Sequence, residues 1–215
     1  MRNIINFVLG FVVAVGLSSG AFAAELENML YLELKTGRVT IELRPDLAPN
    51  HVARVKELAR EGFYDGLLFH RVIAGFMAQT GDPLGNGTGG SGQNLDAEFS
   101  DERHVRGTLS MARSQNPNSA DSQFFIVLKD APHLDSQYTV WGKVTDGMEH
   151  VDQIKLGSSS NNGAVSDPDS SADQLLATWY VDTDSDGYGQ DNVTLTACDQ
   201  PPSYAAQSGD CDDGD

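Results

Sequence analysis

The chain has 215 residues, with 31 acidic and 14 basic side chains and a formal net charge of −17 at pH 7. This length allows one domain with a sizeable core and a small appendage. So acidic a chain is not expected to bind nucleic acid, because its surface would repel phosphates. The charge is uneven: residues 156–215 hold 12 Asp and no Lys or Arg, so a composition boundary falls near residue 156.

Residues 1–23 have the features of a secretory signal peptide. Arg2 precedes an apolar stretch over residues 4–17, and Ala21 and Ala23 supply the small residues that a signal peptidase requires. We expect cleavage near Ala23 and export to a bacterial periplasm, the cell surface or the medium, with no membrane attachment afterwards. A retained membrane anchor is the alternative, which the small-residue site disfavours.

The next residues predict a β-hairpin and a helix. Residues 28–35 and 38–43 alternate apolar and polar side chains around a Thr36-Gly37 turn. Over residues 48–62, valines and leucines recur at helical spacing. Asn50 is expected to be the N-cap of this helix and Gly62 to end it.

Short strands dominate the remainder of the domain. They are expected as two strands within residues 69–82, separated at Ala74-Gly75, and over residues 107–113, 122–128 and 138–144. A short helix follows, with Asp146 as its cap. Many short strands with two helices predict a mainly β domain, an antiparallel barrel or sandwich.

Strand alternation predicts an apolar patch beside polar side chains. Met77 and Gln79 share one face of their strand, and Arg71 on the preceding strand can face the same side. Gln123 and Phe125 likewise share a face, and Phe124 between them points to the opposite face. An apolar slot edged by directional donors is typical of a small-ligand or peptide pocket. The alternative is an ordinary core with the arginine reaching out to solvent.

The glycine-rich segment over residues 85–92, GNGTGGSG, resembles a phosphate-binding loop only superficially. It lacks the Lys-Ser/Thr of a P-loop, and no clear helix follows it. We therefore expect a tight loop that approaches another part of the chain closely, and no bound phosphate.

Several segments, in order, resemble the cyclophilin family of peptidyl-prolyl cis-trans isomerases. They are FHRVIAGFMAQTGD with GNGTGG, then GTLSMAR, SADSQFFIVL and YTVWGKV, and the similarity runs over residues 29–169. The resemblance implies an eight-stranded antiparallel β-barrel capped by two helices. It also implies isomerase activity on X-Pro bonds without a cofactor, with proline-containing peptides and unfolded exported proteins as partners, in a monomer.

The resemblance assigns roles to matching positions. It implies that Arg71, Phe76 and Gln79 are catalytic, with Gln79 holding the substrate backbone and His70 in a supporting role. The other substrate-binding positions that it implies are Met77, Gly87, Ala112, Gln123, Phe125 and Leu134, together with Arg113, His133 and Tyr138, where this chain departs from the familiar pattern of Asn, Trp and His. A proline-peptide binding or chaperone module of a calcium-binding surface protein, with little catalysis, is the competing interpretation.

The acidic tail resembles a calcium-binding repeat of the thrombospondin type 3 kind. Asp182, Asp184 and Asp186 alternate before Gly187, and hard Ca²⁺ prefers such oxygen ligands. In an EF-hand reading the twelfth position is Val193 and lacks a carboxylate, so Asp191 is the candidate substitute. A second acidic cluster follows at Asp210, Asp212, Asp213 and Asp215. The alternative is a disordered acidic extension.

The tail also holds both cysteines. In an oxidising compartment Cys198 and Cys211 are expected to form a disulfide, which would close a loop of about 14 residues and contribute roughly 3 kcal/mol. We therefore divide the chain into a signal peptide (1–23), an isomerase domain (28–172) and an acidic repeat (173–215). Residues 174–181 either supply the closing strand of the barrel or belong to the tail. The final CDDGD suggests a fragment or a ragged repeat.

Overall fold

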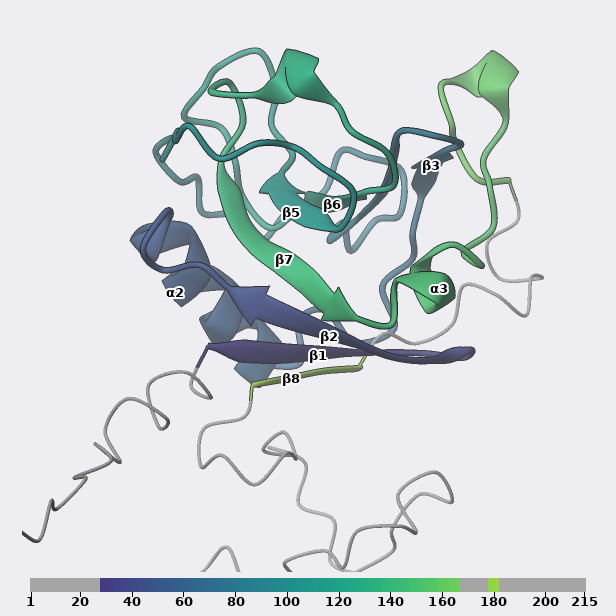
Figure 1. Ribbon diagram of the computed structural model, residues 1–215, viewed down its shortest axis with the longest axis horizontal. Helices are drawn as coiled ribbons and strands as arrows, with labels where there is room; N and C mark the ends of the chain where they lie inside the picture. The colour runs from purple at the N-terminus through teal and green to yellow at the C-terminus, as the bar shows by residue number, and fades with distance from the viewer. Residues whose placement is uncertain (1–27, 167–177, 182–215) are drawn as a thin grey trace, which may run out of the picture.

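The computed structural model of the protein describes residues 28–166 and 178–181. Eight strands form one antiparallel sheet in the order β3-β4-β6-β5-β7-β2-β1-β8. The sheet curls into a half-barrel, with β3 and β8 as its end strands (Figure 1). The strands are β1 (Met29–Leu34), β2 (Gly37–Leu43), β3 (Arg71–Ile73), β4 (Met77–Thr80), β5 (Thr108–Met111), β6 (Phe124–Val127), β7 (Val140–Asp146) and β8 (Thr178–Val181).

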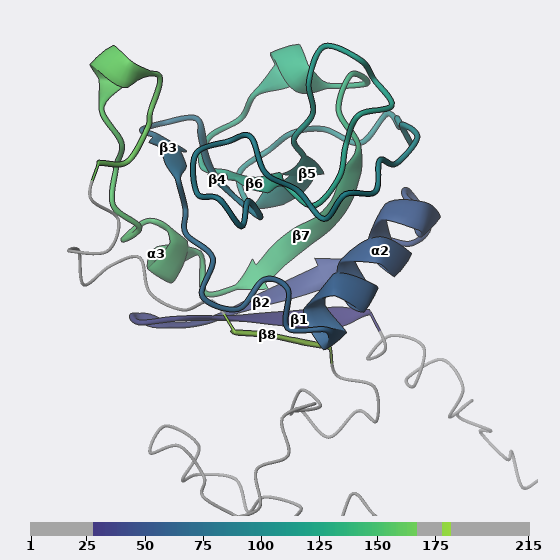
Figure 2. The same ribbon diagram turned by 180° about the vertical axis from the view of Figure 1, so that it is seen from behind.

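Two α-helices accompany the sheet. Helix α2 (Pro49–Arg60) contacts β7 and β8, and helix α3 (Met148–Val151) contacts β2 at a separate place along the sheet (Figure 2). Two short 3-10 helices, η1 (Pro132–Leu134) and η2 (Ser159–Asn161), lie in the loops. The predicted mainly β, antiparallel fold with two helices is therefore confirmed. Within the described residues, no helix has the length and apolar character needed to cross a membrane.

The first hairpin forms as predicted, with its turn shifted by one residue. Leu34 pairs with Gly37, so Lys35 and Thr36 are the central turn residues and Gly37 already begins β2. At the other edge of β1, the strand Thr178–Val181 pairs antiparallel with it. Part of the segment left open by the sequence, residues 174–181, thus extends the sheet.

Helix α2 begins before the expected cap, which is a correction. Its N-cap is Ala48, with Pro49 at the first position, where proline is favoured; Asn50 lies inside the helix. The free N–H groups of Asn50 and His51 instead donate to the carboxylate of Glu98, at 3.1 and 3.0 Å. A loop residue distant in sequence therefore caps this helix. Its end before Gly62 agrees with the prediction.

The cap predicted for the second helix is also wrong. Asp146 is the last residue of β7, because its pairing with Thr40 of β2 keeps it in the sheet. Helix α3 starts after Gly147, which has a left-handed φ of 84°. In the described part of the chain, no side chain caps this helix with a hydrogen bond.

The main core fills the curled sheet and the space beneath α2. Trp141 of β7 and Phe124 of β6 meet edge to face with ring centroids 5.1 Å apart, and both are fully buried. Helix α2 buries Val52, Val55 and Leu58 in the same cluster. Each such side chain stabilises the fold by roughly 1.5–3 kcal/mol relative to an exposed one.

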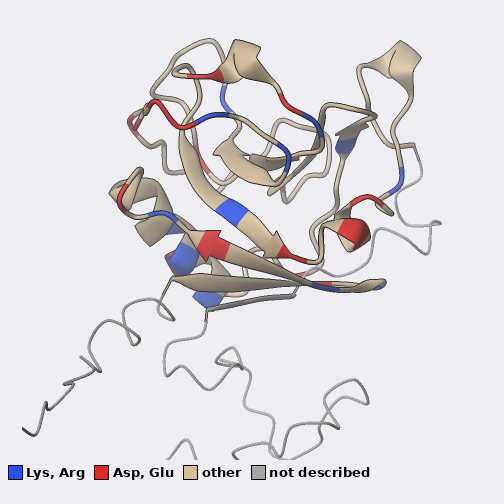
Figure 3. Cartoon of the chain, in the orientation of Figure 1, with Lys and Arg blue, Asp and Glu red and all other residues tan. Residues whose placement is uncertain are grey.

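Lys, Arg, Asp and Glu are interspersed over the described domain (Figure 3). Residues 1–155 hold 19 acidic and 14 basic side chains, so the excess of negative charge there is small. The strongly acidic part of the sequence lies mostly outside the described residues.

Candidate active site

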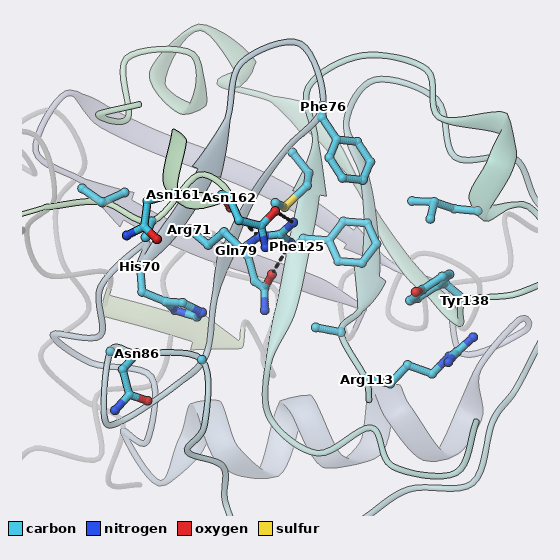
Figure 4. A pocket seen from close by; sticks show the side chains of 17 residues that line it. His70, Arg71, Phe76, Gln79, Asn86, Arg113, Phe125, Tyr138, Asn161 and Asn162 are labelled. Carbon is cyan, nitrogen blue, oxygen red and sulfur yellow. Dashed lines mark hydrogen bonds between the residues drawn. The ribbon is translucent and has the colours of Figure 1, made fainter. Parts of the chain in front are cut away.

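A pocket of about 760 Å³ opens on the outer side of β3, β4 and β6 (Figure 4). Its wall combines strand residues with residues from the loops that join the strands and from the loop after α3. The sequence-predicted site residues that line it are His70, Arg71, Phe76, Met77, Gln79, Gly87, Ala112, Arg113, Phe125, Leu134 and Tyr138. Two further predicted residues, Gln123 and His133, lie next to this lining. The structure therefore brings all of them to one place.

The floor of the pocket is an apolar cluster separate from the main core. Met77, Phe125 and Leu134 are buried within it, and Phe76 and Tyr138 pack against it while partly exposed. Met77 and Phe125 belong to the adjacent strands β4 and β6, so their side chains meet on the outer face. The cluster can hold a small apolar ring.

A chain of hydrogen bonds runs along one side of this floor. Arg71 and Gln79 are direct partners across β3 and β4, and the Arg71 Nη1 donates to the Gln79 Oε1 at 3.1 Å. Gln79 donates from Nε2 to the Oε1 of Gln123 at 2.9 Å. Gln123 in turn donates to the carbonyl oxygen of Gly89 at 2.8 Å. These hydrogen bonds link Arg71, the charged donor of the pocket, to the glycine-rich loop.

The guanidinium of Arg71 is also held from the opposite side, by a residue that the sequence did not indicate. Its Nε donates to the backbone oxygen of Asn162 at 2.9 Å, and its Nη2 donates to the Asn162 Oδ1 at 3.1 Å. Burial lowers the pKa of Arg71, but an arginine side chain stays protonated in proteins. The Asn162-Gly163 pair signals a turn in the sequence, yet nothing local places that turn against Arg71.

Five more residues line the pocket without having been predicted from the sequence. They are Gly85, Asn86, Asn161, Ala164 and Val165. The first two come from the glycine-rich segment and the others from the loop after α3. Only the glycine-rich segment carried a sequence signal.

His70 is buried at the base of the pocket. Burial lowers its pKa and outweighs the opposing effect of the Asp82 charge. The imidazole is therefore neutral at pH 7. A neutral, enclosed ring fits the supporting role implied for His70 better than proton transfer.

Two carboxylates fix the glycine-rich loop. Asp82 accepts from the backbone N–H groups of Leu84 at 2.8 Å and Asn86 at 3.0 Å, and Asp121 accepts from those of Ser91 and Gly92. The N–H groups that a phosphate cradle would use are thus directed at carboxylates. A Cβ on Gly89 would lie 2.1 Å from Asp82 Oδ1, which explains why a glycine stands there.

Tyr138 forms the wall at the far end of the pocket. Its ring meets Phe125 edge-on at a centroid distance of 6.1 Å, and the guanidinium of Arg113 lies over it at 4.4 Å. His133 is exposed at the rim, where its ring tilts against Phe76 at 5.5 Å.

A buried polar group supports the floor from behind. The ring of His104 stacks against Phe125 at 6.4 Å, with its Nδ1 3.1 Å from Asp135 and its Nε2 2.9 Å from the hydroxyl of Ser110. Burial lowers the pKa of His104 and outweighs the opposing effect of its hydrogen bond to the Asp135 carboxylate. Ser110 is fully buried, so Asp135, His104 and Ser110 support the packing of the floor and do not supply a nucleophile.

The predicted tail sites lie outside the described residues. These are the calcium candidates Asp182, Asp184, Asp186 and Asp191 and the cysteines Cys198 and Cys211. Within residues 28–166 and 178–181, no group of three or more His, Cys, Asp or Glu side chains could hold a metal ion. What the described pocket offers is a ring-sized apolar floor with a charged hydrogen-bond donor at its edge.

Comparisons with known proteins agree with this arrangement. A family model described as cyclophilin type peptidyl-prolyl cis-trans isomerase/CLD matches residues 29–172. A probable peptidyl-prolyl cis-trans isomerase of Brucella suis biovar 1 is 58% identical over 169 residues, which cover 73% of this chain and 86% of that protein. Peptidyl-prolyl cis-trans isomerase B of Bacillus subtilis is 46% identical over 130 residues, covering 59% and 90%.

Solved structures have the same fold. A Cryptosporidium parvum cyclophilin type peptidyl-prolyl cis-trans isomerase, crystallised in the presence of the dipeptide Ala-Pro, is similar with a TM-score of 0.61 and 30% sequence identity over 70% of this chain and 95% of that one. The cyclophilin AquaCyp293 of Hirschia baltica is similar with a TM-score of 0.62 and 26% identity, covering 79% and 82%.

Proposed function

The chain belongs to the cyclophilin family and is a peptidyl-prolyl cis-trans isomerase, and from that premise we propose that the pocket around Arg71 catalyses the isomerisation of X-Pro bonds in exported proteins. One observation carries this assignment. The guanidinium of Arg71 lies at the edge of the apolar cluster that contains Met77 and Phe125, and Gln79 holds it there.

The chemistry accounts for this combination. Rotation about an X-Pro bond must break amide resonance, against a barrier of about 18–20 kcal/mol. In the twisted transition state the prolyl nitrogen becomes pyramidal and regains its lone pair. With the proline ring on the apolar floor, an N–H of Arg71 donates to that nitrogen, which barely accepts a hydrogen bond in the planar ground state. The enzyme thus binds the transition state more tightly than the substrate.

The reaction needs neither a nucleophile nor proton transfer, because no bond is made or broken. Gln79 orients the guanidinium through its Oε1 and can hold the substrate backbone through the second N–H of its Nε2. The other side chains exclude water from the twisting amide. A neutral His70 is consistent with this scheme, since no step asks it to exchange a proton.

The test is the isomerisation rate of a short X-Pro peptide, measured as cis-trans exchange by NMR. Arg71→Ala is expected to lower kcat/KM roughly 10²–10³-fold, the usual cost of losing one preorganised donor, with an unchanged circular dichroism spectrum. Arg103→Ala is the matched control, because that arginine is 70% exposed and outside the pocket lining. A wild-type rate in Arg71→Ala would refute the assignment. Micromolar peptide binding with a near-background rate in the wild type would favour the binding-module alternative.

The proposal that the substrates are exported proteins rests on residues 1–23. Proline-limited folding takes about 10–100 s without catalysis, which is slow for a protein folding after export. The intact mass of protein recovered from the periplasm or medium should correspond to a chain that starts at Ala24. Recovery of the uncleaved chain in the membrane fraction would support the anchor alternative instead.

We also propose that the tail binds calcium through Asp182, Asp184, Asp186 and Asp191, stapled by a Cys198–Cys211 disulfide. The support is the alternation of carboxylates before a glycine in the sequence. A calorimetric titration of the oxidised mature protein should show binding between micromolar and millimolar calcium, lost in Asp184→Ala and kept in the control Asp173→Ala. No heat of binding would indicate a disordered acidic extension.

A further inference from the structure

We propose that Asn162 is a positioning residue for the isomerisation, because its two oxygens hold one edge of the Arg71 guanidinium. This inference rests on the proposed role of Arg71. Neither the glycine-rich loop nor the strands carrying the predicted site residues contain Asn162. It belongs to the loop that follows α3, ninety-one positions after Arg71.

The first observation is how the five N–H groups of the guanidinium are used. Nε donates to the backbone oxygen of Asn162 at 2.9 Å and Nη2 to its Oδ1 at 3.1 Å, so one residue grips two adjacent donors. Nη1 donates to Gln79 at 3.1 Å. Since a guanidinium is planar with five N–H groups, one N–H on each terminal nitrogen remains for a substrate. Figure 4 shows Asn162 and Gln79 on either side of Arg71.

The second observation is that the backbone of Asn162 is shaped for this contact. Its φ is 51°, in the left-handed region that asparagine tolerates better than most residues. The following Gly163 has a φ of 79°, and a Cβ there would lie 2.3 Å from Cγ1 of Ile73. The loop is therefore packed directly on β3, and this close approach brings the carbonyl of Asn162 to the guanidinium.

The third observation is that the loop is tied to the backbone on both sides of Arg71. The N–H of Val72 donates to the oxygen of Gly163 at 2.8 Å, and the N–H of Gly157 donates to the oxygen of Val72 at 2.9 Å. On the other side, the N–H of Val165 donates to the oxygen of His70 at 3.0 Å. The loop thus covers the outer edge of β3, and Asn162 has little freedom relative to Arg71.

These contacts give Asn162 a specific task. A donor that stabilises a transition state is effective only when it is already aimed, because reorganisation during the reaction costs rate. Asn162 fixes the edge and plane of the guanidinium before substrate binds, while the apolar floor binds the proline ring independently. Removing its side chain should therefore lower kcat and leave peptide affinity unchanged.

The experiment compares Asn162→Gly with Ser159→Ala, an exposed position of the same loop outside the pocket lining. Glycine accepts the left-handed φ and keeps the backbone acceptor, so only the Oδ1 bond is lost. We expect kcat from NMR exchange at saturating peptide to fall about tenfold, the equivalent of one hydrogen bond to a charged group. Peptide Kd should stay as in the wild type, and Ser159→Ala should behave as the wild type.

A double-mutant cycle separates positioning from a general effect on the loop. In an Arg71→Lys background no Nη2–H remains to donate to the Asn162 Oδ1, so Asn162→Gly should cause no further loss of kcat. A wild-type kcat in Asn162→Gly, or an equal loss in both backgrounds, would overturn the inference. Either result would leave the role of Arg71 standing, since that role fails only if Arg71→Ala retains full activity.

Discussion

Phe124 and Phe125 are consecutive residues of β6 whose side chains lie on opposite faces of the sheet. Phe124 packs edge-on against Trp141 at 5.1 Å and Tyr64 at 5.6 Å in the main core. Phe125 forms the pocket floor with Tyr138 and rests on the ring of His104. Because a strand alternates its side chains, stability and substrate binding are separated between neighbours in the sequence.

Truncating the two rings should therefore have different consequences. Phe124→Ala is expected to lower the free energy of unfolding by about 3–5 kcal/mol, as for large-to-small changes in a packed core. Phe125→Ala should lower it less, because the smaller cluster borders the pocket, and should raise KM for an X-Pro peptide. Urea denaturation and steady-state kinetics on both variants check this. A larger loss of stability in Phe125→Ala would contradict it.

The opposite faces of Phe124 and Phe125 could be predicted from the sequence. The contacts that support the site from distant loops could not. Period-2 alternation placed Met77, Gln79, Gln123 and Phe125 on shared faces, and the turn at Ala74-Gly75 brought Arg71 opposite Gln79. These are contacts within strands or between strands joined by a short turn. Resemblance to a family supplied the wider order of the site.

Contacts that join distant loops escaped sequence reasoning. Glu98 caps α2 from 47 and 48 positions away, so local capping rules pointed to Asn50 instead. Asn162 contacts Arg71 where its loop covers the edge of β3, and no periodic pattern in the sequence predicts this contact. In both cases the sequence shows a suitable side chain but not its partner, because the partner is chosen by the folded arrangement of loops.

Gln123 should couple the catalytic pair to the glycine-rich loop. It accepts from Gln79 at 2.9 Å and donates to the oxygen of Gly89 at 2.8 Å. Gln123→Ala removes the hydrogen bond to the glycine-rich loop, but Arg71 keeps its hydrogen bonds to Gln79 and Asn162. We therefore expect KM to rise several-fold, because each lost hydrogen bond costs about 1 kcal/mol. The value of kcat should change little. Peptide titrations and exchange rates by NMR measure the two quantities. A fall in kcat alone would show that the link serves Arg71 rather than the loop.

Acid should destabilise the protein partly through Asp82. Its burial alone would raise the pKa of the carboxyl, but hydrogen bonds from the N–H groups of Leu84, Gly87 and Asn86 outweigh burial and lower the pKa. Because the unfolded value is about 3.9, the unfolded chain takes up the proton first as pH falls. The stabilisation is complete above about pH 4 and is lost as pH falls through the folded pKa.

Urea unfolding of Asp82→Asn between pH 7 and 3 tests this. The variant should be less stable at pH 7 by about 2 kcal/mol, since an amide replaces a charged acceptor, and the difference should shrink towards the acid end. Asp96→Asn, an exposed carboxylate, serves as the control. A difference that does not change with pH would rule out the carboxylate charge as its source.

The rate should not depend on pH near neutrality. Burial lowers the pKa of both His70 and His104, so each ring stays neutral above the ordinary value of about 6.5. Arg71 remains charged, and no proton is transferred. We expect kcat/KM to be constant from about pH 6.5 to about pH 9, measured by NMR exchange at constant ionic strength. A sigmoidal profile with a midpoint near 7 would indicate that a histidine takes part in the chemistry.

Arg113 should act on the pocket through Tyr138. Its guanidinium lies 4.4 Å from the tyrosine ring centroid and donates to the oxygens of Gln137 at 3.0 Å and Ser114 at 2.8 Å, so it ties two loops together at the pocket wall. Removing it should let Tyr138 move away from Phe125. Arg113→Ala is therefore expected to raise KM several-fold, in line with about 0.5–2 kcal/mol for a cation over an aromatic ring, with little change in kcat.

The matched variant is Arg113→Lys, which keeps the charge but cannot donate to both carbonyls through a planar fork. If the arginine works by clamping the loops, lysine should restore little of the wild-type KM. If it works by its charge alone, lysine should restore most of it, and the KM of both variants should then depend strongly on salt. Peptide KM for the two variants at low and high ionic strength distinguishes these outcomes, and the geometry of the contacts favours the first.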